Sequence, residues 1–414
     1  MHLYRRSSRV QSAVHCLTSN RSANIRSPPS ALGYQYQQQS RNFGKEMKDE
    51  YGSMTSEGET FEAKDFVLES GASLPQAQLR YQTYGNLNQR KDNVIVVCHA
   101  LTGNASLHAW WGELLGKKKA FDTEKYMIVC CNILGSCYGS TNPQSIDPTT
   151  GSTYGKKFPD ISVKDTVKFQ LKLLKEELQI SSIKAVVGGS FGGMQAMEYA
   201  IQAGSQVGDY FSEDGSPYIR SVVPIACGAY HTAWQIAISE VQRQAIYADP
   251  MWKEDPFQAT TGLEIARQLG MISYRTPQGY QKKFGRKLRS DNTPLYGSQA
   301  LWQVKSYLEY QGLKFIDRFD PVTYVKLTEQ MDSHNIARNR AATVEEALNM
   351  IEIPMCVLGI DSDVLYPLSD QEEIAASVPK SELKIINSND GHDGFLLEQD
   401  QVARHIVNFL TAIK

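Results

Sequence analysis

Short apolar runs alternate with segments of helical pattern along the chain from about Phe61 onward. This alternation is typical of an α/β protein, because parallel strands must be joined by crossover segments and these are usually helices. We therefore predict a mostly parallel sheet flanked by helices. Its strands are predicted at Asp65–Leu68, Gln78–Gly85, Asn93–Cys98, Lys125–Asn132, Ile183–Gly188, Ser221–Ala226, Met355–Gly359 and Leu383–Ile386.

The pattern changes between Tyr230 and Glu346, where long helical segments such as Ala233–Ala248 and Gly262–Met271 occur without a clear strand. A helical lid inserted between two late strands leaves the topology of the sheet intact and covers the edge where binding loops gather. The predicted organisation is a leader at 1–45, a core at 46–229, a lid at 230–346 and the closing part of the core at 347–414.

Composition excludes several classes of protein. The chain has 414 residues, 41% of them hydrophobic, which is enough for a large core, and no apolar run approaches the roughly 18 residues that span a bilayer. The net charge is −2, and the body lacks a basic block or heptad repeat, so neither a nucleic acid nor a coiled-coil partner is indicated. The seven cysteines form no Cys-x-x-Cys pair, which predicts reduced, buried thiols and no metal site.

The first 45 residues have a different composition. They contain six arginines, Lys45 and eight serines, and no acidic residue occurs before Glu46. This composition is typical of an organellar transit peptide, and we expect the mitochondrion as its destination. Removing the seven positive charges would change the net charge from −2 to −9. The alternative is a disordered tail on a cytoplasmic protein.

The pentapeptide Gly188-Gly189-Ser190-Phe191-Gly192 lies directly between the apolar run 183–187 and the helical stretch 194–200. A Gly-x-Ser-x-Gly sequence between a strand and a helix is the nucleophile elbow of α/β-hydrolase folds. The turn is so tight that Cβ atoms beside the serine would collide with the neighbouring strand and helix. We therefore predict an α/β-hydrolase fold with the Ser190 hydroxyl exposed at a helix N-terminus.

A serine hydroxyl needs a base, and the base needs an acid that fixes its tautomer. His392 is the predicted base, because it follows the last predicted strand in a loop that opens the final helix. The acid should follow strand Met355–Gly359, which leaves Asp361 and Asp363, and position alone does not separate them. The other downstream histidines, in the lid and the last helix, are interpreted as packing or surface residues: His231, His334 and His405.

An oxyanion hole needs two backbone N–H groups directed at the tetrahedral oxygen. One is expected from Phe191, directly after the nucleophile, and the other from the loop 98–103, where Leu101 is the best candidate. His99, in the same loop, is interpreted as a structural residue that positions the turn.

Longer stretches are far more specific than the elbow alone. They are 98–103 (CHALTG), 109–112 (AWWG), 132–140 (NILGSCYGS), 188–195 (GGSFGGMQ), 243–246 (RQAI), 262–267 (GLEIAR), 273–276 (SYRT), 306–312 (SYLEYQG), 318–320 (RFD) and 391–396 (GHDGFL). In these stretches the chain resembles the homoserine O-acetyltransferase family, and the similarity extends from about Phe66 to Leu410.

The resemblance implies transfer of an acetyl group from acetyl-CoA to the hydroxyl of L-homoserine, through an acyl-serine, on the route to methionine. It assigns the triad to Ser190, Asp363 and His392, since the family's acid is the Asp of a Ser/Thr-Asp pair. It also implies that Arg267 holds the amino acid carboxylate and Asp393 the α-amino group, and a zwitterion requires one cation and one anion.

The same resemblance implies small-molecule substrates, no permanently bound cofactor and a homodimer joined through lid helices. The quoted motifs leave the choice of substrate open. Succinyl-CoA as donor and L-serine as acceptor are the alternatives within the family. A serine hydrolase of small esters is the alternative on the same triad, and a catalytically silent binding protein is a third. A transferase requires a lid that excludes water, because water competes for the acyl-enzyme.

Overall fold

The computed structural model describes residues 48–49, 52–53, 57–205, 208–289, 297 and 302–413. All of them belong to one compact unit, Phe43–Lys414. The predicted leader at 1–45 lies outside the described residues.

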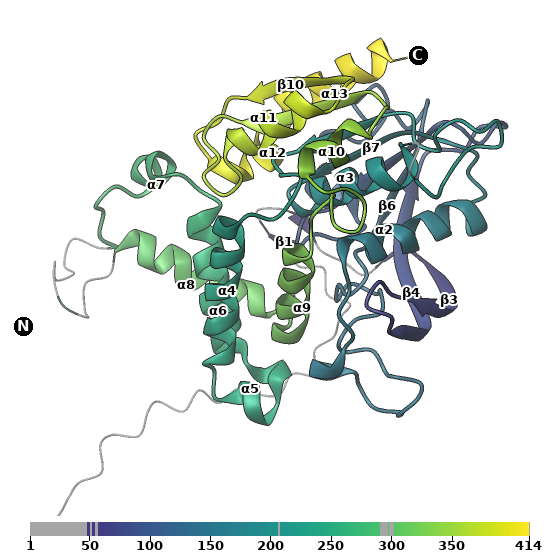
Figure 1. The fold of residues 1–414 in the computed structure, drawn as a ribbon. Coiled ribbons are helices and arrows are strands. Elements are labelled where there is room, and N and C mark those ends of the chain that lie inside the picture. Colours follow the sequence, from purple (N-terminus) through teal and green to yellow (C-terminus); the bar gives the residue numbers. More distant parts are fainter. Residues whose placement is uncertain are drawn as a thin grey trace, which may run out of the picture. The chain divides into compact units, whose positions relative to one another are not determined.

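A single large sheet organises this unit (Figure 1). Its strand order is β10-β9-β8-β7-β5-β6-β4-β3, and the neighbouring pairs from β10 to β6 are parallel, whereas β4 pairs antiparallel with both β6 and β3. The bounds are β3 Glu59–Val67, β4 Ser73–Tyr84, β5 Val94–Cys98, β6 Met127–Cys131, β7 Ile183–Gly189, β8 Val222–Ile225, β9 Met355–Ile360 and β10 Ser381–Ile386; a separate hairpin pairs β1 Lys48–Asp49 with β2 Gly52–Ser53.

The predicted fold class is confirmed, and each predicted strand is present. The central parallel strands are buried along their whole length, which explains why they appear in the sequence as continuous apolar runs. The predictions for β3 and β4 were too short. Exposed polar residues alternate with buried residues in these strands, so no continuous apolar run marked the full length of either strand.

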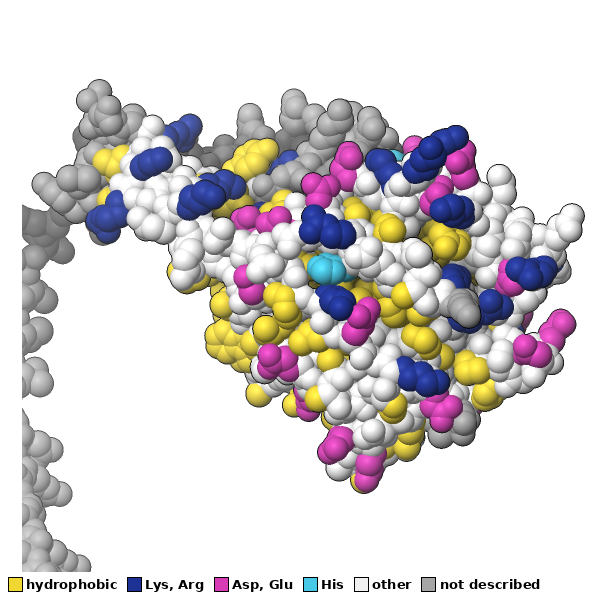
Figure 2. Space-filling view, turned by 90° about the horizontal axis from the view of Figure 1, so that it is seen from above, with side chains coloured by type: hydrophobic (Ala, Val, Ile, Leu, Met, Phe, Trp, Pro, Cys, Tyr) yellow, Lys and Arg dark blue, Asp and Glu magenta, His cyan; other side chains and the backbone are white. Residues whose placement is uncertain are grey.

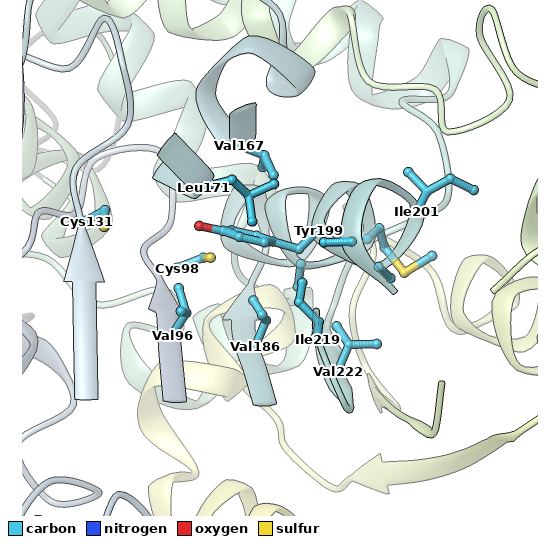
Figure 3. Packing of buried hydrophobic residues seen from close by; sticks show 14 of the residues in the cluster. Val96, Cys98, Cys131, Val167, Leu171, Val186, Tyr199, Ile201, Ile219 and Val222 are labelled. Carbon is cyan, nitrogen blue, oxygen red and sulfur yellow. The ribbon is translucent and has the colours of Figure 1, made fainter. Parts of the chain in front are cut away.

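Helices cover both faces of the sheet. One face packs against α2 (Val163–Lys172), α3 (Phe191–Ala203), α10 (Val344–Asn349) and α11 (Leu368–Ser377). Figure 3 shows Tyr199 of α3 packed between Leu171 of α2 and the strand residue Val186. The opposite face packs against α13 (Gln399–Ala412) and the loop segment that contains α1 (Leu107–Trp110). Short elements complete the core: η1 Gly155–Lys157, η2 Leu173–Glu177, η4 Gly391–Asp393 and α12 Gly394–Leu397.

Helices α4 to α9, which lie between β8 and β9, form a separate group beside the sheet (Figure 1). Their bounds are α4 Ala233–Tyr247, α5 Met251–Glu254, η3 Pro256–Gln258, α6 Thr260–Ser273, α7 Pro277–Lys283, α8 Gln303–Ile316 and α9 Pro321–Asp332. The predicted helices Ala233–Ala248 and Gly262–Met271 correspond to α4 and α6. The predicted lid boundary at 346 falls inside α10, whose Ala347 and Leu348 pack in the core.

Among the described residues, no helix is both long enough and apolar enough to cross a membrane.

Candidate active site

Ser190 joins β7 to α3 and has φ 58° and ψ −123°. This conformation costs a residue with a Cβ atom on the order of 1–3 kcal/mol and is typical of functional turns. A Cβ atom on Gly188 would strike the Gly192 carbonyl, and one on Gly192 would strike the carbonyl of Cys98. The glycines are therefore required, as predicted. The prediction of an exposed hydroxyl is wrong, because Ser190 is only 7% exposed and lies in a pocket.

His392, in η4, lies between the other two triad residues. Its Nε2 atom is 2.7 Å from Ser190 Oγ, and its Nδ1 atom is 2.7 Å from Asp363 Oδ2. The other carboxylate oxygen of Asp363 accepts hydrogen bonds from the backbone N–H groups of Leu365 (2.8 Å) and Tyr366 (2.9 Å). An ionised Asp363 fixed in this way makes Nδ1 of His392 the donor and leaves Nε2 to accept the serine proton.

Asp361 has a different position. It is exposed, and its Oδ1 atom accepts a hydrogen bond of 3.0 Å from the backbone N–H of Ser388. Between the two aspartates, Ser362 Oγ donates to the carbonyl of Ser388 (2.6 Å) and accepts from the N–H of Gly391 (3.2 Å). Asp361 and Ser362 therefore hold the histidine loop, whereas Asp363 contacts the histidine itself.

The two candidate oxyanion donors lie beside the nucleophile. Phe191 is the first residue of α3, where backbone N–H groups have no partner within the helix, and Leu101 lines the pocket that contains Ser190. His99 is fully buried; its Nδ1 donates to the carbonyl of Ala100 (2.8 Å) and its Nε2 accepts from the N–H of Ile133 (3.1 Å). Burial lowers the pKa of His99 to about 4, so the ring is neutral at pH 7 and positions the turn, as predicted.

The pocket around Ser190 and His392 is formed by the core and by the helices between β8 and β9. Its apolar wall consists of Leu101, Trp110, Met331, Leu365, Phe395 and Leu396, and its polar side chains include Arg267, Tyr274, Arg318 and Asp393. Both predicted substrate-binding residues, Arg267 and Asp393, therefore lie in the same pocket as the nucleophile.

Two arginines of this pocket share one aromatic ring. The guanidinium groups of Arg267, on α6, and Arg318, before α9, each lie 4.9 Å from the ring centroid of Phe315. Arg318 also donates from Nη1 to the carbonyl of Thr102 (2.9 Å) and to the hydroxyl of Tyr138 (2.8 Å). In the sequence, Arg318 stands out only as part of the 318–320 motif, and its place in the pocket was not predicted. The one indication in the sequence was the neighbouring Phe319, an aromatic residue that is usually buried and could therefore have placed Arg318 in the interior.

The histidines of the lid were interpreted as packing or surface residues, and both are buried; His231 contacts Tyr366, whose ring packs near His392. His231 Nδ1 lies 2.9 Å from Asp332 Oδ1, and its Nε2 lies 3.1 Å from the Tyr366 hydroxyl. The Tyr366 ring lies 5.1 Å from the ring of His392. His334 donates from Nε2 to the carbonyl of Gly228 (3.0 Å), and burial lowers its pKa to about 3.

Within the described residues, no group of three or more His, Cys, Asp or Glu side chains could hold a metal ion. Five of the described cysteines are buried and Cys137 is half-buried, and each of the six is a free thiol.

Comparisons with known proteins place the chain in a family. A family model described as alpha/beta hydrolase fold matches residues 93–399. The homoserine O-acetyltransferase of Salinibacter ruber (strain DSM 13855 / M31) is 42% identical over 348 residues, covering 83% of this chain and 94% of that protein. The homoserine O-acetyltransferase of Trichormus variabilis (strain ATCC 29413 / PCC 7937) is 41% identical over 351 residues, covering 83% and 91%.

Solved structures share the fold. The crystal structure of homoserine O-acetyltransferase from Bacillus anthracis matches with a TM-score of 0.76 and 23% identity, covering 86% of this chain and 98% of that chain. The crystal structure of esterase E22 matches with a TM-score of 0.74 and 23% identity, covering 86% and 99%. At these identities the structures establish the fold, while the curated relatives establish the family. The chain belongs to the homoserine O-acetyltransferase family of the alpha/beta hydrolase fold.

Proposed function

We propose that this protein transfers an acetyl group from acetyl-CoA to the hydroxyl of L-homoserine, in methionine biosynthesis, through an acyl-Ser190 intermediate. The observation that carries the proposal is the presence of a buried cation, Arg267, and a buried carboxylate, Asp393, in the pocket of Ser190 and His392. An enzyme that passes acyl groups only to water has no use for such a pair. The curated relatives named homoserine O-acetyltransferase support the same activity.

In the first half-reaction, His392 Nε2 takes the proton of Ser190 as its Oγ attacks the thioester carbonyl. The backbone N–H groups of Leu101 and Phe191 stabilise the negative charge on the tetrahedral oxygen. When the intermediate collapses, the carbon–sulfur bond breaks and His392 returns the proton to the departing CoA thiolate. The acetyl group remains on Ser190 as an ester.

In the second half-reaction, the homoserine hydroxyl loses its proton to His392 Nε2 and attacks the acyl-enzyme carbonyl. Arg267 binds the acceptor carboxylate and Asp393 binds its ammonium group, so the hydroxyl is held at the ester. Collapse releases O-acetyl-L-homoserine and returns the proton to Ser190. Both Ser190 and His392 are buried, and the wall of the pocket is largely apolar, which keeps water from the ester.

The fold alone does not separate a transferase from a hydrolase, because esterase E22 matches nearly as well as the Bacillus anthracis enzyme. Within the family, succinyl-CoA as donor and L-serine as acceptor are the alternatives to the proposed substrates. The experiment below therefore compares donors, acceptors and water directly.

Homoserine should accelerate CoA release from acetyl-CoA well above the rate with water alone, and the product should be O-acetyl-L-homoserine. Initial rates should give parallel lines in double-reciprocal plots, because CoA leaves before the acceptor reacts. Free thiol and product are measured, with succinyl-CoA and L-serine run alongside. A rate of CoA release that no amino-alcohol changes would favour the hydrolase.

The same assay tests Arg267. Changing Arg267 to Ala should preserve the burst of acyl-enzyme formation but abolish the acceleration by homoserine, because a buried charge-assisted contact worth a few kcal/mol is lost. Arg404, which is exposed on α13, provides a matched control, and its alanine variant should behave as the wild type. Equal loss of both half-reactions in the Arg267 variant would contradict the role assigned to it.

We also propose a homodimer joined through the lid helices. Apolar side chains that are 36% to 57% exposed gather on α4, α6 and α8: Trp234, Ile236, Val241, Ile265, Ile272, Tyr310 and Leu313. Trp234 and Val241 on α4 are seven residues apart, as are Ile265 and Ile272 on α6. Each pair therefore lies on one side of its helix. Figure 2 shows hydrophobic side chains gathered at one margin of the visible face, with acidic and basic side chains interspersed elsewhere on it.

Light scattering should give a mass near twice the 46.3 kDa of the chain. The double variant Val241→Asp, Ile265→Asp should give the monomer mass, because charges would then be buried in the interface. The control is Ile146→Asp, an exposed residue outside the lid. A wild-type protein with the mass of one chain would contradict the proposal.

For localisation, we propose that residues 1–45 direct the chain to the mitochondrion. The support is their composition alone, which combines arginines and serines without acidic residues. A reporter fused to residues 1–45 should enter the organelle, and a cytosolic reporter would favour the alternative of a tail.

A further inference from the structure

The segment Tyr274–Thr276, directly after α6, contacts the loop that contains His392. The Thr276 hydroxyl donates to the carbonyl of Asn389 (2.5 Å), and the N–H of Asp393 donates to the carbonyl of Tyr274 (3.3 Å). Gly391, with φ +64°, approaches this segment so closely that a Cβ atom would lie 3.0 Å from the Tyr274 carbonyl. The end of a lid helix and the histidine loop are therefore held together.

Arg275 spans this contact with its side chain. Its Nε atom lies 2.7 Å from Asp393 Oδ2, and its Nη1 atom lies 2.8 Å from Asp390 Oδ1. The Arg275 side chain is 11% exposed and that of Asp393 is 6% exposed, whereas that of Asp390 is 40% exposed. The inner ion pair is therefore shielded from water, while the outer one is screened.

The inner pair involves the carboxylate proposed to bind the acceptor ammonium group. The Asp393 carboxylate can rotate about its terminal bond, and the ion pair with Arg275 favours the orientations that keep Oδ2 beside the guanidinium group. Arg275 lies just beyond the end of α6, eight residues after Arg267, which lines the pocket from within that helix. Thus α6 supplies the proposed carboxylate-binding cation, and the segment directly after it supplies the cation beside the proposed ammonium-binding anion.

We infer that Arg275 is a positioning residue for the acceptor half-reaction, acting through the Asp393 carboxylate. This inference rests on the proposed function. Arg275 belongs to the 273–276 motif, but it is neither a triad residue nor part of the pocket lining, so the inference gives it a role that these do not explain. Arg275 touches no reacting atom, and its effect should appear in acceptor binding rather than in acyl-enzyme formation.

The test measures each half-reaction separately. Arg275→Gln should raise the KM for homoserine about 10- to 100-fold, the range expected when a charge-assisted contact no longer orients its partner. The rate and amplitude of the acyl-enzyme burst with acetyl-CoA should stay within about threefold of the wild type. Arg275→Lys, which retains the charge but not the planar fork, should recover part of the loss. Arg286→Lys is the matched control, since Arg286 packs on Trp302, and it should leave both half-reactions unchanged.

A double-mutant cycle shows whether Arg275 acts through Asp393. In an Asp393→Asn background, Arg275→Gln should add no more than about threefold to the KM, because the two changes remove the same contact. If the effects of the two substitutions on the KM multiplied, or if the burst rate and the rate of the acceptor step fell equally, the inference would be overturned. Arg275 would then only stabilise the structure of the histidine loop. An unchanged or lower KM would also overturn the inference. The burst amplitude counts folded active sites, so a folding defect is distinguished from a binding defect.

A wild-type enzyme that homoserine does not accelerate would overturn the proposed function itself, before any variant is compared.

Discussion

Replacing Ser190 with alanine should lower the rate of acyl transfer by about 10⁶-fold, because removing the nucleophile of a comparable triad costs that much. Ser190 Oγ lies 2.7 Å from His392 Nε2, and the change deletes the single atom that forms the covalent intermediate. Alanine keeps the Cβ atom, so the backbone strain at φ 58° is unaltered and no large cavity is left. We therefore expect the fold to persist.

The measurement is free thiol released from acetyl-CoA with saturating homoserine, together with thermal unfolding of the variant. Ser205→Ala is a suitable control, because Ser205 is buried and donates its hydroxyl to the carbonyl of Ile201, away from the pocket. Retention of more than about a hundredth of the wild-type rate by the Ser190 variant would exclude the covalent mechanism.

Replacing Asp363 with asparagine should lower turnover by about 10⁴-fold, whereas Asp361→Asn should have a much smaller effect. The backbone N–H groups of Leu365 and Tyr366 require an acceptor where Asp363 Oδ1 lies. The amide oxygen of asparagine will take that place, so its NH₂ group will face His392 Nδ1. The ring is then forced to carry its proton on Nε2, and it cannot accept the proton of Ser190.

Asp361 has no contact of this kind, since its carboxylate accepts the N–H of Ser388 and is exposed to water. The two asparagine variants are compared by turnover under the same conditions. An exchange of the two results would assign the acid to Asp361 and contradict the geometry of the site.

Local sequence was sufficient for the elbow and for the central strands. The turn around Ser190 needs glycines for steric reasons that act over a few residues, and strands buried on both faces are continuous apolar runs. The histidine could be chosen because it follows the last strand, and loops at the ends of parallel strands gather at one edge. His99 was interpreted as a structural residue of its turn, and His231 and His334 as packing or surface residues of the lid; all three are buried.

The outer antiparallel strands were predicted less well. The exposed positions of β3 and β4 carry polar side chains, and the alternation of polar and apolar residues concealed where each strand begins. The predicted boundary of the lid fell inside α10 for a related reason. The pattern of that helix does not reveal whether its apolar side packs on the lid or on the core.

By itself, the sequence determined the fold class, the nucleophile, the base and the family, because each depends on local turn chemistry, on strand periodicity or on contiguous motifs. The family resemblance assigned the acid to Asp363, and the tertiary structure supplies the physical reason, because the path of the loop decides which of two neighbouring carboxylates meets the histidine. The tertiary structure also decided that Ser190 is buried, that Arg318 lines the same pocket and that Arg275 forms an ion pair with Asp393. Such contacts join segments far apart in the chain, 29 residues for Asp363 and His392 and 115 for Arg275 and Asp390, and no local pattern encodes which of them will meet.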